Sequence, residues 1–162
     1  MDNLLKIDKW LNDNKESMIK DTMELLKINS ESYKREEVAK ALDKTLEIAE
    51  RLGFRTEKRA KGEVGVVFFG EGTETLGILA HVDVVPVGDE NEWTHSPYGE
   101  IFEDKIFGRG ILDNKGMVVS SLYAMAAVKS LKLPIYKKCE LIIGTREEIV
   151  WEDIDEYKRE GH

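Results

Sequence analysis

The stretch "ILAHVDVVP", residues 78–86, ends an apolar, strand-like run with a histidine and an aspartate. His81 and Asp83 are two residues apart, so on a strand their side chains would project to the same face. Burying an imidazole and a carboxylate is costly unless they bond to each other or to a cation. His81 is therefore a candidate metal ligand, with Asp83 holding its other ring N–H. The alternative is a hydrogen bond between the two with a packing role only.

A second cluster, "GRGILDNKG" at 108–116, surrounds Asp113 with three glycines just before a predicted helix. Glycine permits a positive φ and a close approach of the backbone. Asp113 is either the N-cap of that helix or a carboxylate directed at a metal from a tight turn.

A third cluster, "GTREEIVWED" at 144–153, follows another strand-like run. Of two adjacent carboxylates, one can bind a metal while the other acts on a bound water as general base. Glu147 and Glu148 are the candidates for these roles. The alternative is an acidic helix N-terminus, favoured by the helix dipole and supported by Glu152, Asp153 and Asp155.

The hydrophobic periodicity changes from helical to strand-like and back along the chain. It predicts an α/β domain with a central mixed sheet flanked by helices. The expected helices cover 3–28, with a break near 12–15, then 34–52, with Gly53 as C-cap, and 115–131. The expected strands are "FRTEKRA", "VGVVFFG", "LGILAHVDV" and 138–145, with a small hairpin around 101–110.

His81, Asp113 and Glu148 are separated by 32 and 35 residues, about one α/β crossover each. Ligands in open α/β sheets bind beyond the carboxyl ends of strands, so these side chains are expected to converge there. Imidazole and carboxylate ligands suit zinc, manganese or cobalt. A pair of metals about 3.5–4 Å apart would need a bridging carboxylate, an arrangement that hydrolases use to activate water.

The composition narrows the classes of function. The 162 residues carry a net charge of −8 and a pI near 5.0, which argues against nucleic-acid and membrane-surface partners. The single cysteine, Cys139, excludes a disulfide framework and is predicted to be a buried thiol. No secretory h-region or membrane-length apolar run is visible, so we expect a cytoplasmic protein.

These motifs resemble the dinuclear zinc peptidases that include aminoacylases, glutamate carboxypeptidases and bacterial dipeptidases. The resemblance is nearest to the PepV-type, Xaa-His or carnosinase-like dipeptidases. It covers most of the chain and is carried by "GILAHVDVVPVGDENEWTHSPYGEIFEDKIFGRGILDNKG", "GTREE" and "WEDIDEY".

The resemblance implies a role for each residue. His81 would bind one zinc, Glu148 the other, and Asp113 would bridge them, with manganese or cobalt as other possible metals. The candidate catalytic residues are Glu147, as general base, and Asp83, as the partner that orients His81. The implied substrates are small peptides, chiefly dipeptides.

The chain also departs from the family pattern. The family has a further aspartate and histidine ligand and an inserted lid domain, so residues 1–162 resemble the N-terminal portion of one catalytic domain. We expect this portion to be inactive alone, and His162 does not replace the missing ligand. Arg146 stands where the family has a small polar residue, and would either oppose metal binding or point into solvent. The alternatives are a catalytically dead α/β binding module and a related deacylase or carboxypeptidase.

Overall fold

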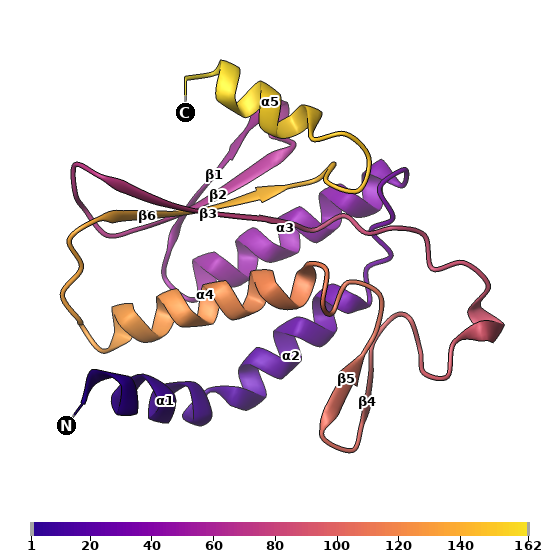
Figure 1. The fold of residues 1–162 in the computed structure, drawn as a ribbon, viewed down its shortest axis with the longest axis horizontal. Coiled ribbons are helices and arrows are strands. Elements are labelled where there is room, and N and C mark those ends of the chain that lie inside the picture. Colours follow the sequence, from indigo (N-terminus) through magenta and orange to yellow (C-terminus); the bar gives the residue numbers. More distant parts are fainter. Residues whose placement is uncertain (1, 162) are drawn as a thin grey trace.

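The computed structural model describes residues 2–161, which form a mixed sheet with helices on both faces (Figure 1). The predicted fold class, α/β with a mixed central sheet, is confirmed. The helices are α1 (Asn3–Asp13), α2 (Lys15–Leu26), α3 (Arg35–Arg51), α4 (Lys115–Ser130) and α5 (Glu152–Arg159), with short 3₁₀ turns at Ala60–Gly62 and Glu90–Glu92. The strands are β1 (Arg55–Arg59), β2 (Val64–Phe69), β3 (Thr75–His81), β4 (Glu100–Phe102), β5 (Lys105–Phe107) and β6 (Lys138–Gly144).

The main sheet has the strand order β1-β2-β6-β3, and β4 and β5 form a separate hairpin. β1 and β6 run antiparallel to β2, whereas β3 and β6 are parallel. The register of that parallel pair places His81, the last residue of β3, opposite Gly144, the last residue of β6. The segments that follow these two strands therefore start side by side at one edge of the sheet.

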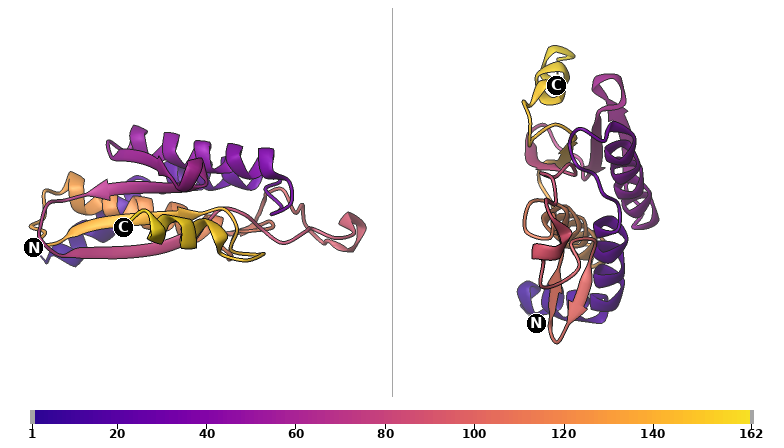
Figure 2. Two further views of the ribbon diagram at one scale, coloured as in Figure 1. Left: turned by 90° about the horizontal axis from the view of Figure 1, so that it is seen from above. Right: turned by 90° about the vertical axis from the view of Figure 1, so that its right-hand side faces the viewer.

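Helices cover the two faces of the sheet unequally. Inward-facing residues of α2, α3 and α4 share one core with the face of the sheet that presents Val67, Leu141 and Ile143. The opposite face carries a smaller cluster, in which Ile154 and Tyr157 of α5 pack on β2. Figure 2 shows α5 apart from the other helices, on its own side of the strands. No helix within residues 2–161 is both long and apolar enough to span a membrane.

Three local expectations are refined. The first helical region is broken, as predicted, and the break falls at Asn14. The expected strand "LGILAHVDV" is too long, because its ladder with β6 stops at His81 and only an isolated bridge between Val84 and Glu31 follows. Cys139 is half-buried rather than buried, and burial raises the pKa of its thiol.

A buried hydroxyl joins α4 to α2. Tyr123 is 1% exposed, and its hydroxyl donates a hydrogen bond of 2.6 Å to Asp21, which also pairs with Arg51 at 2.5 Å. Because hydrogen bonds to charged groups contribute about 1.5–3 kcal/mol, we expect Tyr123→Phe to lower the free energy of unfolding by that amount in urea titrations. Tyr136→Phe, at a side chain that is 85% exposed, is the control. Equal effects of the two changes would contradict this role.

Candidate metal centre

The candidate site lies where the carboxyl ends of β3 and β6 meet. The segment after β3, the turn after β6, the start of α4 and the joint between α2 and α3 all gather at this edge, on the right of Figure 1. His81 comes from β3, Glu147 and Glu148 from the turn after β6, and Asp113 from the turn before α4. The edge predicted from the sequence is therefore the one at which these residues lie.

The His81 imidazole is 4% exposed and faces a different set of oxygens with each nitrogen. Nδ1 lies 3.0 Å from the backbone carbonyl of Asp83 and 3.4 Å from its Oδ1. Nε2 lies 3.0 Å from Oδ1 of Asp113 and 3.7 Å from Oε2 of Glu147. An Nδ1–H that donates to Asp83 leaves the Nε2 lone pair directed at the carboxylates, which is the orientation a metal ligand needs.

Asp83 is fully buried, and its carboxylate joins three segments of the chain. Oδ2 accepts hydrogen bonds from the Ser32 hydroxyl at 2.7 Å and from the backbone N–H of Glu148 at 3.2 Å. Oδ1 accepts the backbone N–H of Glu147, also at 3.2 Å. Asp83 was expected to orient His81. In the structure the same residue also binds the backbone of both candidate glutamates.

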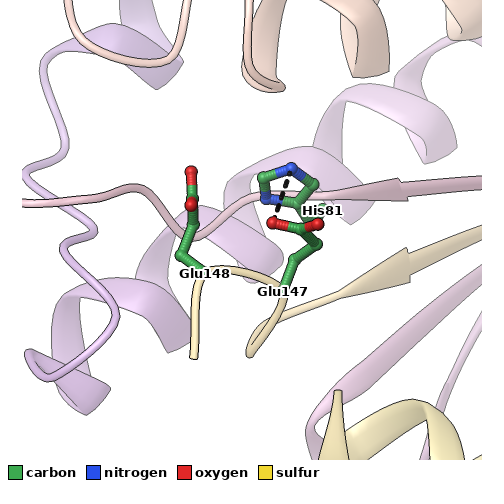
Figure 3. A group of neighbouring side chains, drawn as sticks. All are labelled: His81, Glu147 and Glu148. Carbon is green, nitrogen blue, oxygen red and sulfur yellow. Dashed lines mark ion pairs between the residues drawn. The ribbon is translucent and has the colours of Figure 1, made fainter. Parts of the chain in front are cut away.

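Glu147 and Glu148 lie in the turn between β6 and α5. One oxygen of each and a ring nitrogen of His81 all lie within 4.8 Å of one another. Figure 3 shows the Glu147 carboxylate against the imidazole, with that of Glu148 to one side. The expectation that the pair forms an acidic helix start is wrong, because α5 begins only at Glu152.

Asp113 reaches His81 from a turn shaped by glycines. Gly110 has a φ of 91°, and a Cβ at Gly116 would lie 2.1 Å from the carbonyl oxygen of Ile111. These contacts confirm the expected need for glycine there. The N-cap of α4 is Asn114, so the alternative role of Asp113 as the cap is wrong. Its side chain is 72% exposed and contacts the cluster through Oδ1.

The pKa values reflect a buried base among carboxylates. Burial alone would lower the pKa of His81, but hydrogen bonds and charge from its acidic neighbours outweigh it and raise that pKa to about 9. Burial would raise the pKa of Asp83, yet its hydrogen bonds hold it below the usual value. Burial raises the pKa of Glu148, and the charges of nearby carboxylates add to the effect.

The donor set fits a divalent cation. Asp83, Asp113, Glu147 and Glu148 bring four carboxylates around one imidazole. Ligands on one tetrahedral zinc are about 3.3 Å apart, given bonds of about 2.0–2.1 Å. The 3.0 Å between the facing atoms of His81 and Asp113 is close to that spacing. Four carboxylates beside one neutral imidazole carry an excess negative charge, which bound divalent ions would offset.

The Arg146 side chain does not simply point into solvent. Its Nε and a terminal nitrogen bind both oxygens of Glu63, at 2.9 and 2.7 Å. A second ion pair, with Glu152, is 3.6 Å long. Because both partners are carboxylates, the expectation that Arg146 points into solvent is wrong, and the alternative, that it opposes metal binding, stays a prediction. The other position in doubt, His162, lies outside the described residues.

Comparisons with known proteins show which family the chain resembles. Residues 77–153 match peptidase family M20/M25/M40. Over 153 residues the chain is 40% identical to the "Putative dipeptidase YtjP" of Bacillus subtilis, covering 88% of this chain and 32% of that protein. The chain belongs to this family. The resemblance found in the sequence is thereby confirmed.

Solved structures of M20 peptidases share the fold. Human carnosine dipeptidase 1 superposes with a TM-score of 0.85 at 22% identity, over 99% of this chain and 38% of that one. The M20 family metallo-carboxypeptidase Sso-CP2 of Sulfolobus solfataricus gives a TM-score of 0.81 at 27% identity, over 89% and 34%. This M20 chain spans between a quarter and a third of the length of the curated relatives it matches.

Two groups that shape this M20 site were missed in the sequence. The "NSES" joint at 29–32 lies between two predicted helices and was given no role, yet its Ser32 binds Asp83. Lys115 is buried, donates to the carbonyl of Ile28 at 2.6 Å and so ties the start of α4 to that joint. Burial lowers the pKa of Lys115 to about 8. Its position two residues after Asp113 was the only signal that the sequence offered.

Proposed function

We propose that this chain forms the metal-binding part of an M20 peptidase that hydrolyses dipeptides at a pair of divalent ions, with zinc as the expected metal. The observation that supports this most is the convergence of His81, Glu147 and Glu148, with Asp113 3.0 Å from the imidazole. The names of the curated relatives support peptide hydrolysis, and dipeptides in particular.

Each residue has a proposed task. His81, Glu148 and the bridging Asp113 would hold the ions, which when bound supply Lewis acidity and activate water. Glu147 would accept the proton of the attacking water and return it to the leaving amine. Asp83 keeps the Nδ1 side of His81 occupied, so that Nε2 would be free to bind the metal.

We further propose that residues 1–162 are the N-terminal portion of the catalytic domain. The match to only 32% of YtjP supports this. Each ion would have only two protein ligands in this chain, His81 and Asp113 for one and Glu148 and Asp113 for the other. Catalytic zinc ordinarily has three protein ligands and a water. The remaining part of the domain would supply the others.

The chain alone should therefore bind zinc but hydrolyse dipeptides poorly. We expect isothermal titration of zinc to show binding that Glu148→Gln weakens by about 10-fold or more, as loss of a charged ligand requires. A dipeptide panel assayed with zinc or manganese should give little turnover. Robust turnover that a chelator and Glu147→Ala both abolish would contradict the proposed partial nature of the site. An absence of zinc binding would instead favour the catalytically dead binding module.

A carboxypeptidase is the second candidate function. Its support is the 27% identity to the M20 metallo-carboxypeptidase Sso-CP2. A chimera that joins this chain to the part of YtjP outside the matched region would separate the two. Dipeptidase activity predicts preference for dipeptides over longer peptides, and the reverse preference would favour the carboxypeptidase.

A further inference from the structure

The joint between α2 and α3 runs beside the segment that carries the site. The Ser32 N–H donates to the carbonyl of Val84, and the Val84 N–H donates to the carbonyl of Ser30, each at 3.0 Å. Ser30 and Ser32 are 0% and 3% exposed. Buried hydroxyls need hydrogen-bond partners. The acceptor of each serine hydroxyl therefore shows which neighbouring group the joint holds in position.

The two serine hydroxyls bind different kinds of acceptor at the same distance. Ser30 donates to the backbone carbonyl of Val82 at 2.7 Å. The nearest acceptor of the Ser32 hydroxyl is Oδ2 of Asp83, also at 2.7 Å, while the carbonyl oxygen of Val84 lies farther away, at 3.3 Å. The first bond fixes only the backbone of the neighbouring segment, whereas the second fixes a side chain that has further partners.

We propose that Ser32 is a positioning residue of the metal centre, which acts through Asp83 on the backbone of Glu147 and Glu148. The Asp83 carboxylate accepts one N–H on each oxygen, at 3.2 Å, and Ser32 shares Oδ2 with Glu148. If the Asp83 carboxylate rotates about its Cβ–Cγ bond, it cannot keep all three hydrogen bonds. The hydrogen bond from Ser32 therefore favours the carboxylate orientation that also accepts the N–H groups of Glu147 and Glu148.

A second contact supports the same link. Arg35, at the start of α3, donates to the carbonyl of Ser32 at 3.2 Å and to the carbonyl of Thr145 at 2.7 Å. The joint is thus tied to the turn after β6 directly as well as through Asp83. The effect on metal binding rests on the proposed function, but the effect on the backbone of the two glutamates does not.

Ser32→Ala and Ser30→Ala form a matched pair, since each removes one buried hydroxyl from the same joint. In amide hydrogen exchange of the whole chain, Ser32→Ala should raise the exchange of the Glu147 and Glu148 amides by about 10-fold relative to core amides of α4. Ser30→Ala should change that ratio by less than about 2-fold. Ser32→Thr, which keeps a hydroxyl, should restore protection. Equal effects of Ser32→Ala and Ser30→Ala on the ratio would overturn the proposal.

Zinc titration of the same variants adds a functional readout. Ser32→Ala should weaken zinc binding by about 10–100-fold, as loss of partners of metal ligands does elsewhere, and Ser30→Ala should leave it within about 2-fold. If the unaltered chain binds no zinc, the proposed function fails while the exchange result still decides the role of Ser32.

One measurement needs no variant. Scalar couplings across the hydrogen bonds, between the Glu147 and Glu148 amide nitrogens and the Asp83 carboxyl carbon, should be detectable in the unaltered chain. Their absence would overturn the proposal even if Ser32→Ala does not fold.

Discussion

Glu147→Gln should lower kcat by about 10²–10⁴-fold while both metals stay bound, when placed in the chimera with the remainder of YtjP. That range is the usual contribution of a positioned general base. The substitution keeps the size of the side chain and removes only its ability to accept the proton of water. KM should change less than kcat, because a base contributes to the transition state more than to substrate binding. Steady-state kinetics on a dipeptide, with zinc content measured on the same samples, test this.

Glu148→Gln is the matched control for that experiment. It makes the same chemical change one residue away, yet should lower zinc content and activity together, because Glu148 is the proposed ligand. The structure makes this test necessary, since the Glu147 carboxylate is itself only 3.7 Å from His81 Nε2. Loss of zinc in Glu147→Gln with retention in Glu148→Gln would reverse the two roles. If neither change alters zinc content or activity, neither glutamate takes part in the proposed mechanism.

The sequence predicted the parts of the site that depend on local pattern. Apolar runs marked β3 and β6, and polar residues at their ends marked the edge at which the candidate site lies. The glycines around Asp113 predicted a tight turn before α4. These features are local because strand ends and turns are encoded by neighbouring residues.

Contacts between distant segments could not be predicted in this way. Ser32 and Asp83 are 51 residues apart, and Arg146 and Glu63 are 83 apart. No periodicity encodes such pairs, so Ser32 resembled any polar loop residue and Arg146 resembled an unpaired cation. The end of β3 at His81 was missed for a related reason. Val82 and Val84 continue the β-branched pattern, but their backbone groups bond to the joint as well as to β6.

The tertiary role of Asp83 leads to the largest expected effect on stability. Asp83→Ala removes the shared acceptor of one hydroxyl and two backbone N–H groups, and leaves Nδ1 of His81 without a carboxylate neighbour. Breaking a buried charged pair typically costs about 3–5 kcal/mol, out of a total stability of about 5–15 kcal/mol. We therefore expect a loss of that size in the free energy of unfolding, measured by urea titration.

Asp89→Ala is the control, because the Asp89 side chain is exposed and its hydrogen bonds, both to Asn91, only cap the short turn Glu90–Glu92. It should lower the free energy of unfolding by only about 1 kcal/mol, the usual cost of losing an N-cap, and so by clearly less than Asp83→Ala. Zinc titration separates the two functions of Asp83. Asp83 is expected to hold the two glutamates as well as the histidine, and Ser32 acts only through Asp83. Any folded fraction of Asp83→Ala should therefore bind zinc more weakly than Ser32→Ala does. Zinc affinity in Asp83→Ala equal to that of the unaltered chain would show that the ligands keep their positions without Asp83.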